Sequence, residues 1–96
     1  MNEVLLVEYQ YPIQPDWSTD EIVAVIKFFE CVEKGYEKGI QREMLLETYR
    51  RFKEIVPSKG QEKTICDEFQ ETSGYSAYLA VKTAKESDGT KIVRIK

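Results

Sequence analysis

The sequence contains no histidine among its 96 residues. Histidine is the side chain that most often acts as a general base near neutral pH, and it is also the commonest protein ligand of transition metals. Catalytic triads that combine Ser or Cys with His are therefore excluded. We expect a protein that is not an enzyme and that uses no cofactor and no metal ion.

Cysteine is also scarce, since Cys31 and Cys66 are the only two thiols in the chain. They have no partner at short range, and both lie within apolar patterns. This is typical of reduced cysteines that pack as small hydrophobic side chains inside the cell. A regulatory disulfide between them is the alternative.

Long hydrophobic runs are missing as well. The longest covers the five residues 22–26, whereas a helix that crosses a bilayer needs roughly 20 apolar residues. At the N-terminus, acidic Glu3 and Glu8 surround a short apolar run, so the basic and longer apolar regions of a secretory signal are absent. We therefore expect a cytoplasmic protein that does not contact the membrane.

The chain is instead rich in hydrophobic side chains, which make up 42% of its residues and include four Phe, six Tyr and one Trp. A chain of this length can bury one compact core but not two. The composition predicts a single domain over residues 1–96, with residues 1–16 as an extended N-terminal segment and residues 89–96 as a C-terminal tail.

The clearest helix signal begins at Ser18. Ser18 and Glu21 have the spacing of a capping box, and Trp17 and Ile22 have the spacing of a hydrophobic staple. The helix should run to about Gly35. Because it is apolar around most of its circumference, other elements should pack around it. The apolar positions are Ile22, Val23, Val25, Ile26, Phe28, Phe29, Cys31, Val32 and Tyr36.

Three further helices are predicted after this one. The second should run from about Gln41 until Pro57 stops it, and the third should open at Ser58 and end near Gly74. The fourth should run from Tyr75 or Ser76 to about Ser87, with an inward face made of Tyr78, Leu79, Val81 and Ala84.

The fold class that follows is all-α: a compact bundle of about four helices with the first helix at its centre. Residues 4–7 and 92–95 are rich in strand-forming side chains. They either pair as a short β ribbon, remain extended, or dock on a neighbouring chain.

Several segments resemble the YktA-like proteins, a family of small bacterial proteins catalogued as uncharacterised. They are YQYP at 9–12 with Asp16-Trp17, EIVAVIKFFECVEK at 21–34, YRRFKEIVPSK at 49–59 and ICDEFQETSGYSAYLAVKTAK at 65–85. The resemblance covers roughly residues 9–88. It implies a compact helical fold and a bacterial cytosolic setting, and it provides no catalytic, metal-binding or cofactor residue.

Charge is unevenly distributed along the chain. Residues 1–48 carry ten acidic and four basic side chains, whereas residues 49–96 carry seven acidic and ten basic ones. A basic group spans the junction of the second and third helices: Arg50, Arg51, Lys53, Lys59 and Lys63. Cations near a helix C-terminus complement its dipole whatever the function. The functional alternative is a docking patch for an acidic protein surface or for nucleic-acid phosphates.

The third and fourth predicted helices loosely resemble a helix-turn-helix. However, the connection from Phe69 to Gly74 is longer than the usual turn. The second helix of the pair offers only Lys82 and Lys85 as bases, and it contains no Arg, Asn or Gln to read base edges. The sequence therefore favours a protein over a nucleic acid as the partner.

Two other groups have a structural and a functional interpretation. Tyr9, Tyr11 and Trp17 either cover the core or form an exposed aromatic surface that binds a partner. Glu30, Glu33 and the nearby Glu37 could in principle bind a metal, but a solvated face is the better interpretation. The leading hypothesis is an adaptor or regulatory protein that contacts another protein or a second copy of itself, and the alternative is a nucleic-acid-binding module.

Overall fold

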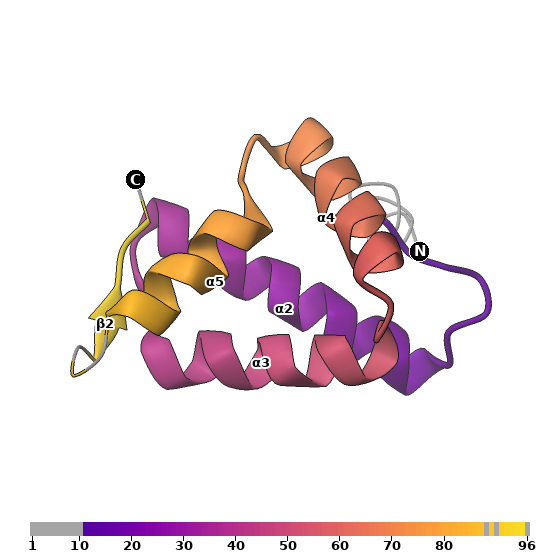
Figure 1. Ribbon diagram of the computed structural model, residues 1–96, viewed down its shortest axis with the longest axis horizontal. Coiled ribbons are helices and arrows are strands. Elements are labelled where there is room, and N and C mark those ends of the chain that lie inside the picture. The colour runs from indigo at the N-terminus through magenta and orange to yellow at the C-terminus, as the bar shows by residue number, and fades with distance from the viewer. Residues whose placement is uncertain (1–10, 88, 90, 96) are drawn as a thin grey trace, which may run out of the picture.

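A computed structural model describes residues 11–87, 89 and 91–95, and these residues form four helices and a two-stranded antiparallel sheet (Figure 1). In chain order the elements are α2 (Thr19–Glu37), β1 (Ile40–Gln41), α3 (Arg42–Ile55), α4 (Lys59–Ser73), α5 (Ala77–Glu86) and β2 (Ile92–Val93). The predicted bundle of about four helices is confirmed. In this part of the chain, no helix is long and apolar enough to cross a membrane.

Local side-chain chemistry sets the ends of the helices. The Ser18 hydroxyl accepts a hydrogen bond from the Glu21 amide at 3.2 Å, and the Glu21 carboxylate accepts one from the Ser18 amide at 2.8 Å, so the predicted capping box is formed. Ser58 and Ser76 each accept a bond from an amide in the first turn of α4 and α5. Gly74 ends α4 in the left-handed conformation, with φ of 83°.

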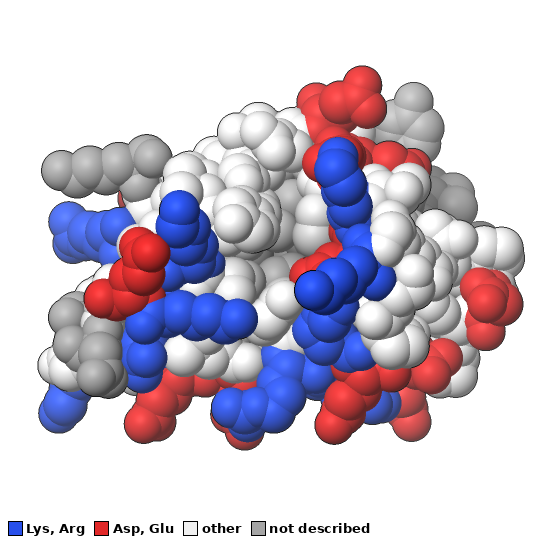
Figure 2. All heavy atoms as spheres, in the orientation of Figure 1, with Lys and Arg blue, Asp and Glu red and all other residues white. Residues whose placement is uncertain are grey.

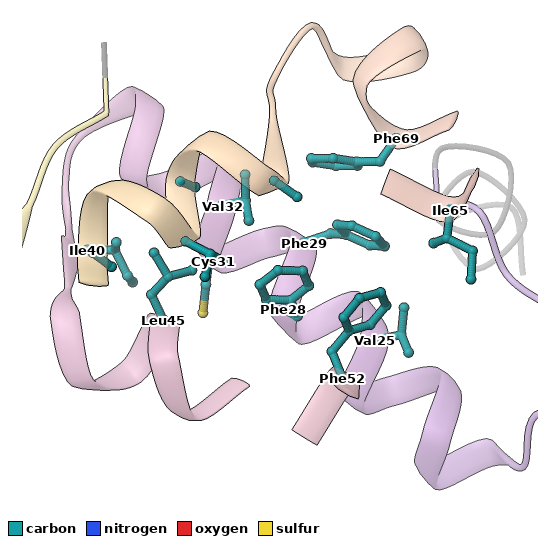
Figure 3. Close-up of a cluster of buried hydrophobic side chains, with 14 of the residues drawn as sticks. Val25, Phe28, Phe29, Cys31, Val32, Ile40, Leu45, Phe52, Ile65 and Phe69 are labelled. Atoms are coloured by element: carbon teal, nitrogen blue, oxygen red, sulfur yellow. The ribbon is translucent and has the colours of Figure 1, made fainter. Parts of the chain in front are cut away.

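Helix α2 lies at the centre of the core, as predicted. Phe28 and Phe29 are completely buried, and their rings pack against rings from two other helices (Figure 3). Phe28 stacks on Phe52 of α3 with 4.9 Å between centroids, and Phe29 stacks on Phe69 of α4 at 4.3 Å. Val23 departs from the prediction, because 57% of its surface is exposed.

The predicted inward face of α5 is half wrong. Tyr78 and Leu79 point outward, with exposed fractions of 74% and 39%. Val81 and Ala84 are buried as predicted, and Ala77 and Ala80 are buried in place of Tyr78 and Leu79. The buried residues lie three or four positions apart, which is the spacing of one helix face, as do those of the predicted set. Because alanine side chains are short, the backbone of α5 can approach the neighbouring helices closely. The larger side chains are left facing solvent.

The C-terminal end is part of the core rather than a tail. β2 pairs with β1 in antiparallel register, with Val93 opposite Ile40. Val93 and Ile95 are only 2% and 4% exposed. The Ile95 amide donates to the Gly35 carbonyl at 3.0 Å, and a side chain at Gly35 would collide with Ile95. The prediction of a C-terminal tail is therefore wrong for residues 92–95.

Candidate functional site

A groove of about 850 Å³ lies between α4 and α5. Figure 2 shows it as the hollow in the middle of this face, with basic side chains gathered on both sides. Its apolar floor includes Phe28, Tyr49, Cys66, Ala77 and Val81, and its edges carry Lys59, Lys63, Lys82 and Lys85. The floor therefore comes from all four helices, and two helices supply the charged edges.

The two walls are held in place by contacts with α2. Phe69 anchors α4 on Phe29 through the stacked rings described above. At the turn between the walls, Tyr75 stacks on Tyr36 with 4.6 Å between centroids, and the Tyr36 hydroxyl accepts a hydrogen bond from the Ser76 amide at 3.2 Å. The start of α5 is thereby fixed to α2, and the groove is shaped before any ligand binds.

At the floor of the groove, Tyr49 and Lys53 share the carboxylate of Glu62. The Tyr49 hydroxyl donates to Glu62 at 2.9 Å, and the Lys53 ammonium donates to the other carboxylate oxygen at 2.6 Å. Burial, assisted by the bond to Glu62, raises the pKa of Tyr49 to about 12. Burial also raises the pKa of the Cys66 thiol to about 12, and the negative charges of Glu62 and Asp67 contribute. Both groups are therefore uncharged at neutral pH.

The four lysines at the edges differ in their contacts. Lys63 forms an exposed ion pair with Asp67 at 2.8 Å, and Lys85 places its ammonium 5.4 Å from the centroid of the Tyr49 ring. Lys59 and Lys82 are exposed and form no ion pair with any residue that the structure describes. Each wall of the groove therefore presents one lysine outside an ion pair, and the α5 wall also carries the exposed Glu86.

The predicted basic group at the junction of α3 and α4 is divided by the fold. Lys59 and Lys63 line the groove, whereas Arg50, Arg51 and Lys53 do not. Arg51 pairs with Glu54 at 3.2 Å, and Lys53 pairs with Glu62 as described above. Lys82 and Lys85 form the other lysine edge of the groove. In the sequence they were considered only as the two basic side chains of a possible DNA-recognition helix. Their three-residue spacing on one face of α5 was the available signal.

The predicted aromatic surface is wrong for Tyr11 and Trp17, which are only 7% and 8% exposed. Both belong to the core, so the structural interpretation, that this segment covers the core, is confirmed for them. The Tyr11 hydroxyl donates to Glu33 at 2.9 Å. Tyr9 and the strand-forming residues 4–7 lie outside the described residues. The exposed aromatic ring at the groove is Tyr78.

The cysteines and the acidic group of α2 also have a place in the fold. Cys31 is buried and Cys66 is half-buried, and both are free thiols as predicted. Glu37, like Glu33, accepts a hydrogen bond from a tyrosine, in its case Tyr75 at 3.0 Å. Within residues 11–87, 89 and 91–95, no three Cys, Asp or Glu side chains are grouped so that they could hold a metal ion.

Comparison with known proteins places this chain among bacterial relatives. A family model described as "Uncharacterised protein family (UPF0223)" matches residues 8–93. The chain is 58% identical over 89 residues to a UPF0223 protein of Bacillus pumilus, across 93% of this chain and 100% of that relative. It is 60% identical over 86 residues to the UPF0223 protein YktA of Bacillus subtilis, across 90% and 98% of the two chains. A relative from Lysinibacillus sphaericus is 55% identical over 89 residues, across 93% and 94%.

Proposed function

The chain belongs to the uncharacterised protein family UPF0223, and we propose that it is a non-enzymatic adaptor or regulatory protein that binds another protein in the groove between α4 and α5. The predicted YktA-like family is confirmed, but its name assigns no activity. One observation carries the proposal: a groove with an apolar floor, in which Tyr49 and Cys66 are half-buried, lies between two edges of lysines. The bacterial cytoplasm is the setting that we propose for it.

Three properties of the groove support a protein partner. Its floor is largely apolar, as the centre of a protein interface is. Tyr78 lines the groove and is 74% exposed, and tyrosine is among the side chains that contribute most to binding energy at interfaces. The walls are fixed by their contacts with α2, so little conformational entropy is lost when a partner binds.

A photocrosslinking experiment tests this function. The photoreactive residue p-benzoylphenylalanine replaces Tyr78 at the groove in one variant and Val23, which is exposed on α2, in a control variant. Both are expressed in the bacterium that makes the protein. We expect one defined protein to crosslink at position 78 and not at position 23.

The captured protein is then purified and titrated against the native chain and against a Lys59→Glu/Lys82→Glu variant. Binding that the double charge reversal weakens roughly tenfold would support the adaptor function, since tenfold corresponds to about 1.4 kcal/mol. The function would be contradicted if no adduct were specific to position 78, or if the reversal left affinity unchanged. An adduct between two copies of the chain would identify a homodimer as the bound form.

The alternative is a nucleic-acid-binding module, and the convergence of lysines from two helices favours it. A complex held by phosphate contacts must appear at low salt and weaken steeply as salt rises. A gel-shift titration with single-stranded and duplex DNA is the direct test. We expect the adaptor to give no shift at micromolar protein, whereas a salt-sensitive shift that the lysine reversal abolishes would favour the alternative.

A further inference from the structure

We infer that the occupant of the groove is an acidic amphipathic helix of the partner protein, an inference that rests on the adaptor function proposed above. The floor between the walls presents half-buried Tyr49 and Cys66 together with Val81. Because the Tyr49 hydroxyl and the Cys66 thiol stay protonated at neutral pH, this floor carries no charge. An occupant must therefore bring an apolar stripe to it.

The lysines on the two walls determine which charge the occupant should carry beside its apolar stripe. Lys59 and Lys63 are four residues apart on α4, and Lys82 and Lys85 are three residues apart on α5, so each pair lies along one face of its helix. Cations on both walls are complementary to an occupant that carries carboxylates on both sides of its apolar stripe. An α-helix with apolar residues at positions i, i+4 and i+7 and acidic residues beside them has this arrangement.

Acidic side chains in the groove offset part of this charge, because three acids line it beside the four lysines: Glu62, Asp67 and Glu86. Glu62 is bound by Lys53 and Tyr49, and Asp67 is paired with Lys63. Glu86 is exposed on α5 and has no ion pair with a described residue. Lys59 and Lys82 are left without an ion pair in the described part of the chain, one on each wall. With four lysines against three acids, the lining of the groove carries a net charge of +1, and each wall presents one lysine that is free of an ion pair within the described residues.

Other shapes of ligand fit this site less well. A bound β-strand needs a row of unpaired backbone groups, but the groove is lined almost entirely by helical residues, whose backbone groups bond within their own helices. A nucleic acid would stack its bases on exposed ring faces. Three aromatic rings line the groove, but Phe28 is completely buried and the Lys85 ammonium lies over Tyr49, so Tyr78 alone among them offers an exposed face for stacking.

A peptide library displayed on phage tests the inference. Random peptides of about 16 residues, ~24 Å long as helices at 1.5 Å per residue, are selected on the immobilised full chain. Peptides that also bind the Lys59→Glu/Lys82→Glu variant are removed. This variant should still fold, because Lys59 and Lys82 are both exposed. The glutamate that replaces Lys59 also lies in the first turn of α4, where negative charge interacts favourably with the helix dipole. A Lys27→Glu/Lys38→Glu variant makes the same charge change outside the groove.

The selected peptides are expected to be enriched in Asp and Glu and to carry apolar residues at intervals of three or four. Binding of the best peptide, followed by ¹⁵N NMR, should shift amide signals of α4 and α5 and make the peptide helical. The groove reversal should weaken its affinity roughly tenfold or more, rising salt should weaken it further, and the control reversal should change it less than twofold.

Groove-binding peptides that lack acidic residues or adopt an extended form would overturn the inference and leave the adaptor function standing. A library that yields no groove-dependent peptide would also overturn it, and the crosslinking experiment then decides the adaptor function separately. Displacement of the peptide by a more tightly bound single-stranded DNA would overturn it in favour of the nucleic-acid alternative.

Discussion

Glu62 interacts with three side chains at the groove. It accepts hydrogen bonds from Tyr49 and Lys53, and its charge helps to raise the pKa of Cys66. Because the thiolate is the reactive form of a cysteine, this environment suppresses the reactivity of Cys66 at neutral pH. The reactivity of the Cys66 thiol therefore depends on the charge of Glu62 beside it.

A Glu62→Gln substitution should make Cys66 react faster with Ellman's reagent at mildly alkaline pH. Removing the negative charge lowers the pKa of the thiol, although burial keeps it above its usual value of 9.0. Each unit of pKa changes the thiolate fraction roughly tenfold, so we expect an acceleration of about two- to tenfold. Cys31 is only 4% exposed and should react only on unfolding.

The matched control is Glu68→Gln, which removes an exposed carboxylate from the same helix but does not contribute to the Cys66 shift. Its reaction rate should equal that of the native chain. Equal rates for both variants would contradict the electrostatic part of this account.

Tyr49 makes stability depend on alkaline pH. Its pKa is raised from 10.0 to about 12 in the folded chain, so above pH 10.0 the unfolded chain loses a proton that the folded chain retains. The free energy of unfolding should therefore decrease as pH rises from about 10 toward about 12. Urea unfolding across this range should show a smaller decrease for Tyr49→Phe. For Tyr78→Phe, at an exposed ring without a tertiary hydrogen bond in the described structure, the decrease should equal that of the native chain.

At the scale of the elements, α4 requires glycine at its C-terminal end but not in its first turn. Gly74 has a φ of 83°, in the left-handed region, whereas Gly60 lies in the first turn of the helix with space for a side chain. Gly74→Ala should lower the free energy of unfolding by about 1 kcal/mol. Gly60→Ala should raise it by up to about 1 kcal/mol, because alanine is the better helix former.

Thermal and urea unfolding would measure the free energy of unfolding of the Gly74→Ala and Gly60→Ala variants. The substitution is chemically the same, so the opposite signs come only from backbone conformation. A Gly74→Asn variant should recover part of the loss, since asparagine tolerates this conformation better. Equal effects of alanine at both positions would contradict the assigned end of α4.

At the scale of the whole molecule, the C-terminal strand closes the core over α2. Ile95→Ala should cost about 2–4 kcal/mol, because a buried isoleucine side chain is removed from a packed site. Ile92→Ala removes the same atoms from a side chain that is 50% exposed, and it should cost less than about 1 kcal/mol. Urea unfolding that gives similar losses for both would show that the end of the chain does not pack as described.

Much of the helical framework was predictable because its signals are local. Ser18, Ser58 and Gly74 each act on residues within one helical turn, so their effect is visible in a short stretch of sequence. The central position of α2 followed from the nearly continuous apolar surface that it presents. Prediction failed on α5, because helical spacing alone does not say whether alanines or larger side chains face the core.

The sequence alone determined that the chain is helical, where its helices begin and end, and which side chain chemistries are missing from it. Tertiary structure alone decided that Val93 pairs with Ile40, and that lysines of α4 and α5 face one another across an apolar floor. These contacts join residues far apart in the chain. Their geometry depends on how whole helices pack, whereas caps and turns depend only on neighbouring residues.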